Sequence, residues 1–266
     1  MNSPNIKQVF ERSSMYRRAR TVVSKVRRRF ARKPKPRPFS DYIPFKETLK
    51  AASAAGVSVG EFIERKHMVG QQTALDQTMD GLGGLGLFNS QIERVCELGP
   101  GSGRYLEKTM ARCHPRHYEI YETSREWRGW LVEQHRVVAR ACNGKNLAET
   151  ESSSIDLVHA HKLFPGLPFL VTASYLPEMA RVAREGGWIV FDIMTEACFN
   201  QQYLKAWFDA NPWEWSWSPH MVARNYAVDL LAERGASLVG SFQVPLWPGI
   251  TECMVFRKAA PSRPPA

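Results

Sequence analysis

The sequence predicts an α/β protein with a doubly wound, mostly parallel β-sheet and helices on both faces. Three observations lead to this prediction. Between residues 94 and 193, short apolar runs alternate with amphipathic helical patterns, which is typical of consecutive βαβ units. Two later apolar runs are joined by a Pro-Gly turn, which indicates a C-terminal hairpin whose last strand is antiparallel to the rest. The composition, with 44% hydrophobic and 23% charged residues, is that of a folded protein.

The apolar runs place seven strands in chain order, at residues 94–98, 118–121, 137–141, 155–160, 188–193, 237–246 and 252–257. A helical pattern covers residues 45–66. A second helix is expected to begin at Ser218 and Pro219, because serine caps helices and proline suits a first turn, and to stop at Gly235. The glycine-rich run at residues 81–86 lacks the Gly-Lys-Ser/Thr ending of a phosphate-binding loop, so we expect a flexible connection there.

These patterns divide the chain into three parts. Residues 1–38 form a basic tail that ends in alternating lysine or arginine and proline, which predicts an extended linker. Residues 39–90 form a helical N-terminal extension that is expected to act as a lid over the site. Residues 91–260 form the single α/β domain, which the length of 266 residues allows.

The positive charge of the protein is confined to its tail. The whole chain carries a net charge of +10, but residues 1–38 contain 13 basic residues and one acid, which gives this segment +12 and leaves the remainder at −2. The composition therefore does not favour nucleic acid as a partner of the folded body.

Within the tail, apolar residues recur every three or four positions among arginines and lysines, at Tyr16, Ala19, Val23, Val26 and Phe30. This spacing predicts a basic amphipathic helix. Such a helix is compatible with an anionic membrane surface, an acidic partner, nucleic acid or a transit-type presequence, and equally with a solvated, partly disordered tail.

The five cysteines are widely spaced and form no Cys-x-x-Cys pair, so the sequence predicts neither a disulfide framework nor a cysteine zinc site. No apolar stretch approaches the roughly 18 to 20 residues that span a bilayer, and the N-terminus has arginines where a secretory signal would be apolar. We therefore expect a cytoplasmic protein, with peripheral attachment to a membrane as the alternative.

The strongest local signal is the sequence VCELGPGSGRYL at residues 95–106. A buried strand that carries Glu97 is followed by a turn with glycines at positions 99, 101 and 103, and a helix begins there. Gly99, Gly101 and Gly103 lack side chains that would keep a ligand from the backbone, and the helix N-terminus offers oriented N–H groups. The alternative to a ligand-binding turn is an ordinary structural turn between a strand and a helix.

The dinucleotide fingerprint would need glycine where this chain has Arg104, so a nicotinamide cofactor is disfavoured. The pattern Glu-x-Gly-x-Gly-x-Gly instead resembles motif I of the class I S-adenosylmethionine-dependent methyltransferases. The resemblance extends over about residues 92–258 and implies a Rossmann-like fold. It also implies S-adenosyl-L-methionine as cofactor, with Glu97 and the three glycines among the residues that bind it.

Two further residues are expected at the cofactor. Glu122 ends the second strand 19 residues after Gly103, close to the offset at which a carboxylate binds ribose hydroxyls in such folds. Glu119 is the competitor, but it lies inside the strand. The resemblance places an adenine-binding aspartate after the third strand, where this chain has Asn143. Asparagine keeps the acceptor oxygen and lacks the charge.

Methyl transfer to a hydroxyl requires alignment of the acceptor and removal of its proton. His159 and His161 follow the fourth strand on the same side of the chain, and His161 is the expected base because it lies further toward the carboxyl end. Asp192 ends the fifth strand, where it could complete a metal site with the histidines, orient a histidine or be a structural acid. A His-x-His pair alone does not make a metal site, so no metal is predicted.

Trp213, Trp215 and Trp217 lie where the methyltransferases carry insertions that select substrates. Flat aromatic faces suit sugar rings or planar acceptors, and they equally suit a hydrophobic cap on the core. The sequence thus predicts a methyltransferase that acts on a hydroxyl of a small molecule or glycan. The competing prediction is a non-catalytic S-adenosylmethionine-binding scaffold tethered by its tail to a membrane or nucleic acid.

Overall fold

The computed structural model describes residues 43–66, 73–209, 219–246 and 249–259. The basic tail at residues 1–38 lies outside the described residues, as do Trp213, Trp215 and Trp217. The predictions made for these residues therefore stay predictions.

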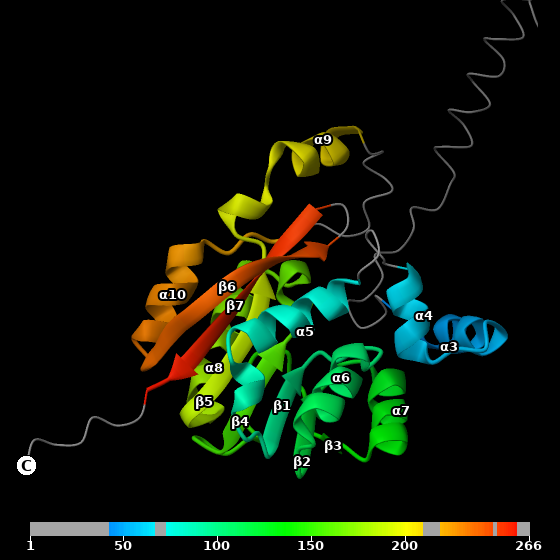
Figure 1. Cartoon of the computed structure of the whole chain (residues 1–266), viewed down its shortest axis with the longest axis horizontal. Coiled ribbons are helices and arrows are strands. Elements are labelled where there is room, and N and C mark those ends of the chain that lie inside the picture. Colours follow the sequence, from blue (N-terminus) through cyan, green and yellow to red (C-terminus); the bar gives the residue numbers. More distant parts are fainter. Residues whose placement is uncertain (1–42, 67–72, 210–218, 247–248, 260–266) are drawn as a thin grey trace, which may run out of the picture. The chain divides into compact units, whose positions relative to one another are not determined.

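A seven-stranded sheet in the order β3-β2-β1-β4-β5-β7-β6 forms the centre of the described structure (Figure 1). The first five strands run parallel, and β7 pairs antiparallel with both β5 and β6. This arrangement confirms the predicted mostly parallel sheet with an antiparallel C-terminal strand. The strands are β1 (Arg94–Leu98), β2 (His117–Tyr121), β3 (Val138–Ala139), β4 (Ile155–Ala160), β5 (Ala183–Ile193), β6 (Ala236–Leu246) and β7 (Gly249–Lys258).

Helices cover both faces of this sheet, as the continuous apolar runs of its strands predict. The helices are α3 (Phe45–Ala54), α4 (Val59–Lys66), α5 (Ala74–Gly84), α6 (Arg104–Cys113), α7 (Arg125–His135), α8 (Phe169–Val182), α9 (Gln201–Asp209) and α10 (Arg224–Ala232). Within the described residues, three short 3₁₀ helices occur at Leu87–Asn89, Phe164–Gly166 and Glu196–Cys198.

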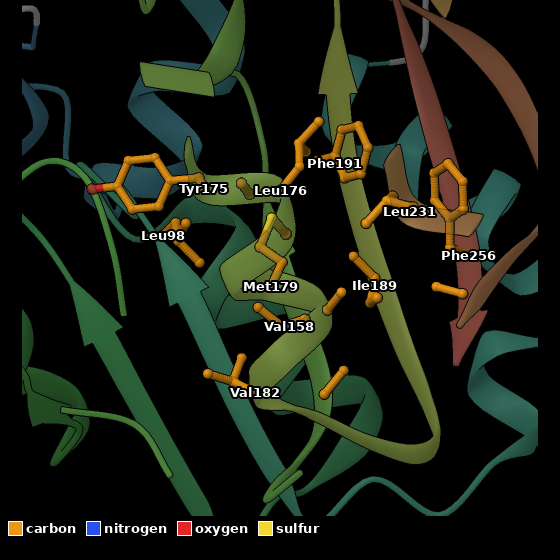
Figure 2. Close-up of a cluster of buried hydrophobic side chains, with 14 of the residues drawn as sticks. Leu98, Val158, Tyr175, Leu176, Met179, Val182, Ile189, Phe191, Leu231 and Phe256 are labelled. Carbon is orange, nitrogen blue, oxygen red and sulfur yellow. The ribbon is translucent and has the colours of Figure 1, made fainter. Parts of the chain in front are cut away.

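Alternation along the strands divides the core into two clusters. In β5, Ile189 and Phe191 pack on one face with Met179 of α8 and Leu231 of α10 (Figure 2). Val190, between them, belongs to the cluster on the opposite face, which contains Leu82, Leu106 and Leu131 of α5, α6 and α7. Successive side chains of a strand point to opposite faces of the sheet, so each face of β5 packs against a different set of helices.

The glycine-rich run at residues 81–86 is not the flexible connection that we expected, because residues up to Gly84 belong to α5. The reason is tertiary packing. A Cβ added at Gly81 would lie 2.5 Å from the ring of Phe242 in β6. Glycine therefore lets α5 pack close to the sheet, so this part of the N-terminal extension is an integral layer of the domain.

Two other boundaries differ from the prediction. The helical pattern at residues 45–66 is broken into α3 and α4 around Gly56, whose φ is +65°. The last helix begins at Arg224 rather than at Ser218 and Pro219. Its approach is extended because Met221 forms a bridge with Met194 and Val222 donates a backbone hydrogen bond to Met194, which holds this stretch beside the end of β5.

Candidate functional site

The turn between β1 and α6 contains three glycines in the left-handed region, with φ of +60° at Gly99, +53° at Gly101 and +78° at Gly103. Residues other than glycine rarely adopt such angles, which explains the glycine at every second position. Gly99 donates a 2.8 Å hydrogen bond to Tyr121 O and so extends the pairing of β1 with β2. Gly103 is the N-cap of α6 and lies so close to Leu131 that a Cβ would approach it to 2.5 Å.

A cavity of about 150 Å³ opens against this turn, where the carboxyl ends of β1, β2 and β4 meet. In sheets of this type, ligands bind at that edge. Backbone and side chains of the turn form one wall. The other walls come from the ends of β2 and β4, from Ile43 and Trp127, and from Cys142, Gly144 and Tyr175. Trp127 Nε1 donates a 2.7 Å hydrogen bond to Ile43 O, which ties the start of the described chain to α7.

Glu122 is placed at this cavity and is almost fully buried. Its carboxylate accepts 2.8 Å hydrogen bonds from the backbone N–H groups of Gly101 and Ser124. Burial raises the pKa of Glu122, and these backbone hydrogen bonds oppose the rise. Each carboxylate oxygen has two lone pairs, so Glu122 can also accept from a ligand in the cavity.

His161 also lines the cavity, and its ring stacks on Tyr105 with 4.4 Å between centroids. Burial, assisted by the charges of Lys162 and Arg104, lowers its pKa to about 3. The imidazole is therefore neutral at physiological pH. Arg104 is held by α4, because its guanidinium donates a 2.5 Å hydrogen bond to Glu64.

Asp192 lies behind this wall and is bonded to neither histidine among the described residues. Its carboxylate accepts from the backbone N–H of Lys162 at 2.5 Å and from the hydroxyl of Thr251 at 2.8 Å. The Lys162 ammonium lies 3.2 Å from the same carboxylate and bonds Thr251 as well. Of the three roles considered for Asp192, these contacts favour the structural one, in which the carboxylate holds Lys162 in its left-handed conformation.

Glu97 and His159 are not among the residues that line the cavity. Both are buried and meet through Tyr118, whose hydroxyl lies 2.7 Å from the Glu97 carboxylate and 2.9 Å from His159 Nε2. Burial raises the pKa of Glu97 to about 8, and burial with the nearby His161 lowers the pKa of His159. This network separates the two histidines: His161 faces the cavity, while His159 belongs to the interior.

Asn143 is exposed, and its neighbours Cys142 and Gly144 line the cavity in its place. Its side-chain oxygen accepts from the backbone N–H groups of Lys145 and Asn146, at 2.9 and 3.1 Å. The amide thus stabilises its own turn, and the structure brings the backbone of this loop, rather than the Asn143 side chain, to the cavity. Glu119, the competitor of Glu122, lies within the sheet and pairs with Arg140 at 2.8 Å.

The sequence did not reveal several residues of the cavity. Ile43 and Trp127 come from segments that carry no recognisable motif, and Tyr105 and Tyr175 resemble ordinary core aromatics of amphipathic helices. Lys162 also lines the cavity. Its position directly after the histidine pair, at the end of an apolar strand, is the sequence feature that could have identified it. No group of three or more potential metal ligands occurs within the described ranges. None of the helices described is long and apolar enough to cross a bilayer.

Comparison of the sequence with family models and with curated proteins finds no match. Solved structures nevertheless have a similar fold. Magnesium protoporphyrin IX methyltransferase from Synechocystis, solved with S-adenosylhomocysteine, is 12% identical, with a TM-score of 0.54 and coverage of 79% of this chain and 100% of that one. This chain has the class I methyltransferase fold.

Two other methyltransferase structures agree. The 1,6-didemethyltoxoflavin-N1-methyltransferase from Burkholderia thailandensis is 15% identical, with a TM-score of 0.52 and coverage of 81% of this chain and 89% of that one. An O-methyltransferase family protein from the same organism is 13% identical, with a TM-score of 0.52 and coverage of 84% and 70%. In the methyltransferase fold of this chain, the cavity lies between the glycine turn and the end of β2.

Proposed function

We propose that the protein is an S-adenosylmethionine-dependent methyltransferase that acts on a hydroxyl of a small molecule or glycan. The observation that carries this proposal is the cavity in which the left-handed glycine turn and the buried carboxylate of Glu122 face the same space. Neighbours in the structural comparison were solved with S-adenosylhomocysteine in place.

The residues at the cavity fit this cofactor. A Cβ at Gly101 would meet only Ile43, at 3.6 Å, so the backbone there borders open space. Ser102 Oγ is buried at the same wall and has no hydrogen-bond partner in the described structure. We assign the ribose hydroxyls to Glu122, and the remainder of the cofactor to the backbone of the glycine turn and of residues 142–144. Trp127 also lines this cavity.

When bound, the cofactor supplies a methyl group on a positively charged sulfur to a nucleophile. The chain's own contribution is to hold that nucleophile and to exclude water. His161 is neutral and, among the described residues, has no hydrogen-bond partner, so it can accept a hydrogen bond from an acceptor hydroxyl. A pKa of about 3 makes the imidazole a weak proton acceptor. We therefore propose that His161 orients the hydroxyl first and takes its proton only as the bond to carbon forms.

The hydroxyl preference is the finer part of the proposal. The structural neighbours include enzymes named for methyl transfer to nitrogen and to carbon. The preference rests on His161, because a hydroxyl acceptor needs a hydrogen-bond acceptor beside it, and the neutral imidazole of His161 lines the cavity with no hydrogen-bond partner among the described residues.

Isothermal titration with S-adenosylhomocysteine tests the cofactor proposal. The wild type should bind, and Glu122→Gln should bind at least about tenfold more weakly because it loses a charged acceptor at the ribose. Glu119→Gln is the matched control, since Glu119 is equally buried but faces Arg140, and it should alter stability without altering affinity. Equal affinity of wild type and Glu122→Gln would refute the assignment.

Incubation with a labelled methyl donor and fractionated lysate then separates an enzyme from the non-catalytic scaffold. Transfer of label to a small molecule or glycan, absent in His161→Ala, supports the enzyme. Tight binding of S-adenosylhomocysteine with no labelled product in any fraction favours the scaffold.

A further inference from the structure

The segment that borders the cavity after β4 is free of charge. Residues 163–177, LFPGLPFLVTASYLP, contain no acidic or basic side chain. Leu163, Leu167 and Tyr175 of this segment line the cavity. The first nine residues of α8 belong to the same segment, and surface helices normally carry charged residues on their outer face.

The segment exposes apolar side chains instead of burying them all. Leu170 is 77% exposed and Phe169 is 38% exposed, directly after the cavity-lining Leu167. Phe169 contacts Tyr226 of α10, with 5.1 Å between ring centroids, and Tyr226 is 39% exposed. Met221, half exposed, lies next to His220, whose backbone N–H bonds Pro165 O.

These four residues, Phe169, Leu170, Met221 and Tyr226, form what we define as the apolar rim. Scattered apolar residues are normal on a protein surface, but several exposed apolar residues near a binding cavity are typical of an interaction site. The rim lies at the carboxyl-end edge of the sheet, as the cavity does, because Phe169 begins the helix after β4 and Met221 forms a bridge with Met194 directly after β5.

A second observation concerns charge. The chain that precedes the described residues has a net charge of +12 over residues 1–38, and it joins them at Ile43, which itself lines the cavity. A basic segment of this kind is attracted to anionic lipid headgroups, at about 1 kcal/mol per basic residue near the surface. Stable attachment takes two signals, an electrostatic one and an apolar one.

We propose that the apolar rim docks on an anionic lipid bilayer, with the cavity mouth toward the lipid. The rim supplies insertion of Leu170, Phe169 and Met221 into the interface, and Tyr226 matches the aromatic residues that favour the headgroup level. The basic segment supplies the long-range attraction. A second copy of the chain would also cover apolar residues, but pairing two chains that each carry a net charge of +10 brings like charges together, which opposes it.

Co-sedimentation of the full-length protein with vesicles tests this proposal. One set of vesicles is phosphatidylcholine with about one quarter phosphatidylglycerol, and the other is phosphatidylcholine alone. The variants are Leu170→Glu and Met221→Glu. Val239→Glu is the matched control, because Val239 is 43% exposed and lies in β6, away from the carboxyl end of β5. Its neighbour Leu238 pairs with Phe256 of β7, and Phe256 pairs with Ile189 in the middle of β5.

The wild type and Val239→Glu should bind the anionic vesicles alike, whereas Leu170→Glu should bind about tenfold more weakly, since a charge in place of leucine opposes insertion. The difference should persist when NaCl is raised from about 0.05 M to about 0.5 M, which screens the basic segment but not the apolar contact. The proposal is overturned if Leu170→Glu binds like the wild type, or if Val239→Glu loses as much binding.

Two further outcomes also overturn it. In the first outcome, high salt abolishes binding to the anionic vesicles and Leu170→Glu binds like the wild type at low salt. Attachment would then depend on the basic segment alone. The other is absence of vesicle binding together with a dimer in sedimentation velocity that Leu170→Glu dissociates. Titration with S-adenosylhomocysteine in solution should be unchanged in Leu170→Glu. It reports on the proposed cofactor independently of the vesicles, so failure of one proposal does not imply failure of the other.

Discussion

Replacing Gly101 by valine tests the glycine turn most directly. Gly101 has φ of +53°, which is unfavourable for any residue with a Cβ and most of all for a β-branched one. The backbone cost is about 1–2 kcal/mol. At about 2–4 °C per kcal/mol for a domain of this size, the melting temperature should fall by about 2–8 °C.

The added side chain also projects where the cavity is open, because the nearest atom to a Cβ at this position is Ile43 Cδ1 at 3.6 Å. A ligand against the turn would have to share that space with two methyl groups. We therefore expect the affinity for S-adenosylhomocysteine, measured by isothermal titration, to fall at least about tenfold, which is about 1.4 kcal/mol.

Gly56→Val separates strain from occupation of the site. Gly56 has a similar φ of +65°, no atom lies within 4 Å of its added Cβ, and it is not at the cavity. This variant should lose stability to a similar extent and keep its affinity. If Gly101→Val keeps wild-type affinity while its melting temperature falls, no ligand approaches the turn and the cofactor assignment is refuted. Equal losses of affinity in both variants would show that strain, not occupation, is responsible.

Three other predictions follow from the packing and the pKa values. Burial raises the pKa of Glu97 from 4.5 to about 8, so the stability associated with this group is present below pH 4.5 and lost as the pH rises through 8; urea unfolding at pH 6 and pH 9 should differ less in Glu97→Gln than in the wild type. Because the pKa of His161 is about 3, its protonation should not affect the rate of methyl transfer between about pH 5 and 8. Any inflection of the rate in this range should therefore be present in both the wild type and His161→Asn. Gly81→Ala should lower stability by about 1–3 kcal/mol in thermal denaturation, since its Cβ would lie 2.5 Å from the Phe242 ring, and Phe242→Leu should restore part of the loss.

The sheet was predictable because its central strands are buried on both faces. Strands β1 and β4 begin and end where their apolar runs do, and the predicted antiparallel hairpin is present at residues 236–258. The run at residues 81–86 was not predictable from local propensity, because the helix there depends on Phe242, more than 150 residues away. The start of α10 was likewise decided by pairing with Met194 rather than by the Ser-Pro cap.

The site followed the sequence where position along a strand determines exposure to the cavity. Glu122 and His161 lie at strand ends and line the cavity, as their positions indicated. The sequence could not show that Glu97 and His159 lie in the interior and not at the cavity. Both bond the hydroxyl of Tyr118, and this contact depends on the order of β2, β1 and β4 in the sheet. The direction of the Asn143 side chain depends on the shape of its own turn, in which it accepts hydrogen bonds from Lys145 and Asn146. The local sequence did not predict this turn.

The insertion of β7 between β5 and β6 has a consequence for biosynthesis. Residues 249–258 are translated after the other six strands described, yet β5 pairs with them along six residues, and Thr251 joins Asp192 and Lys162 behind the cavity. A nascent chain that has not yet released these residues from the ribosome exposes the unpaired edge of β5, a long apolar strand of the kind that promotes aggregation. The sheet therefore stays incomplete until residues 249–258 have emerged and paired with β5.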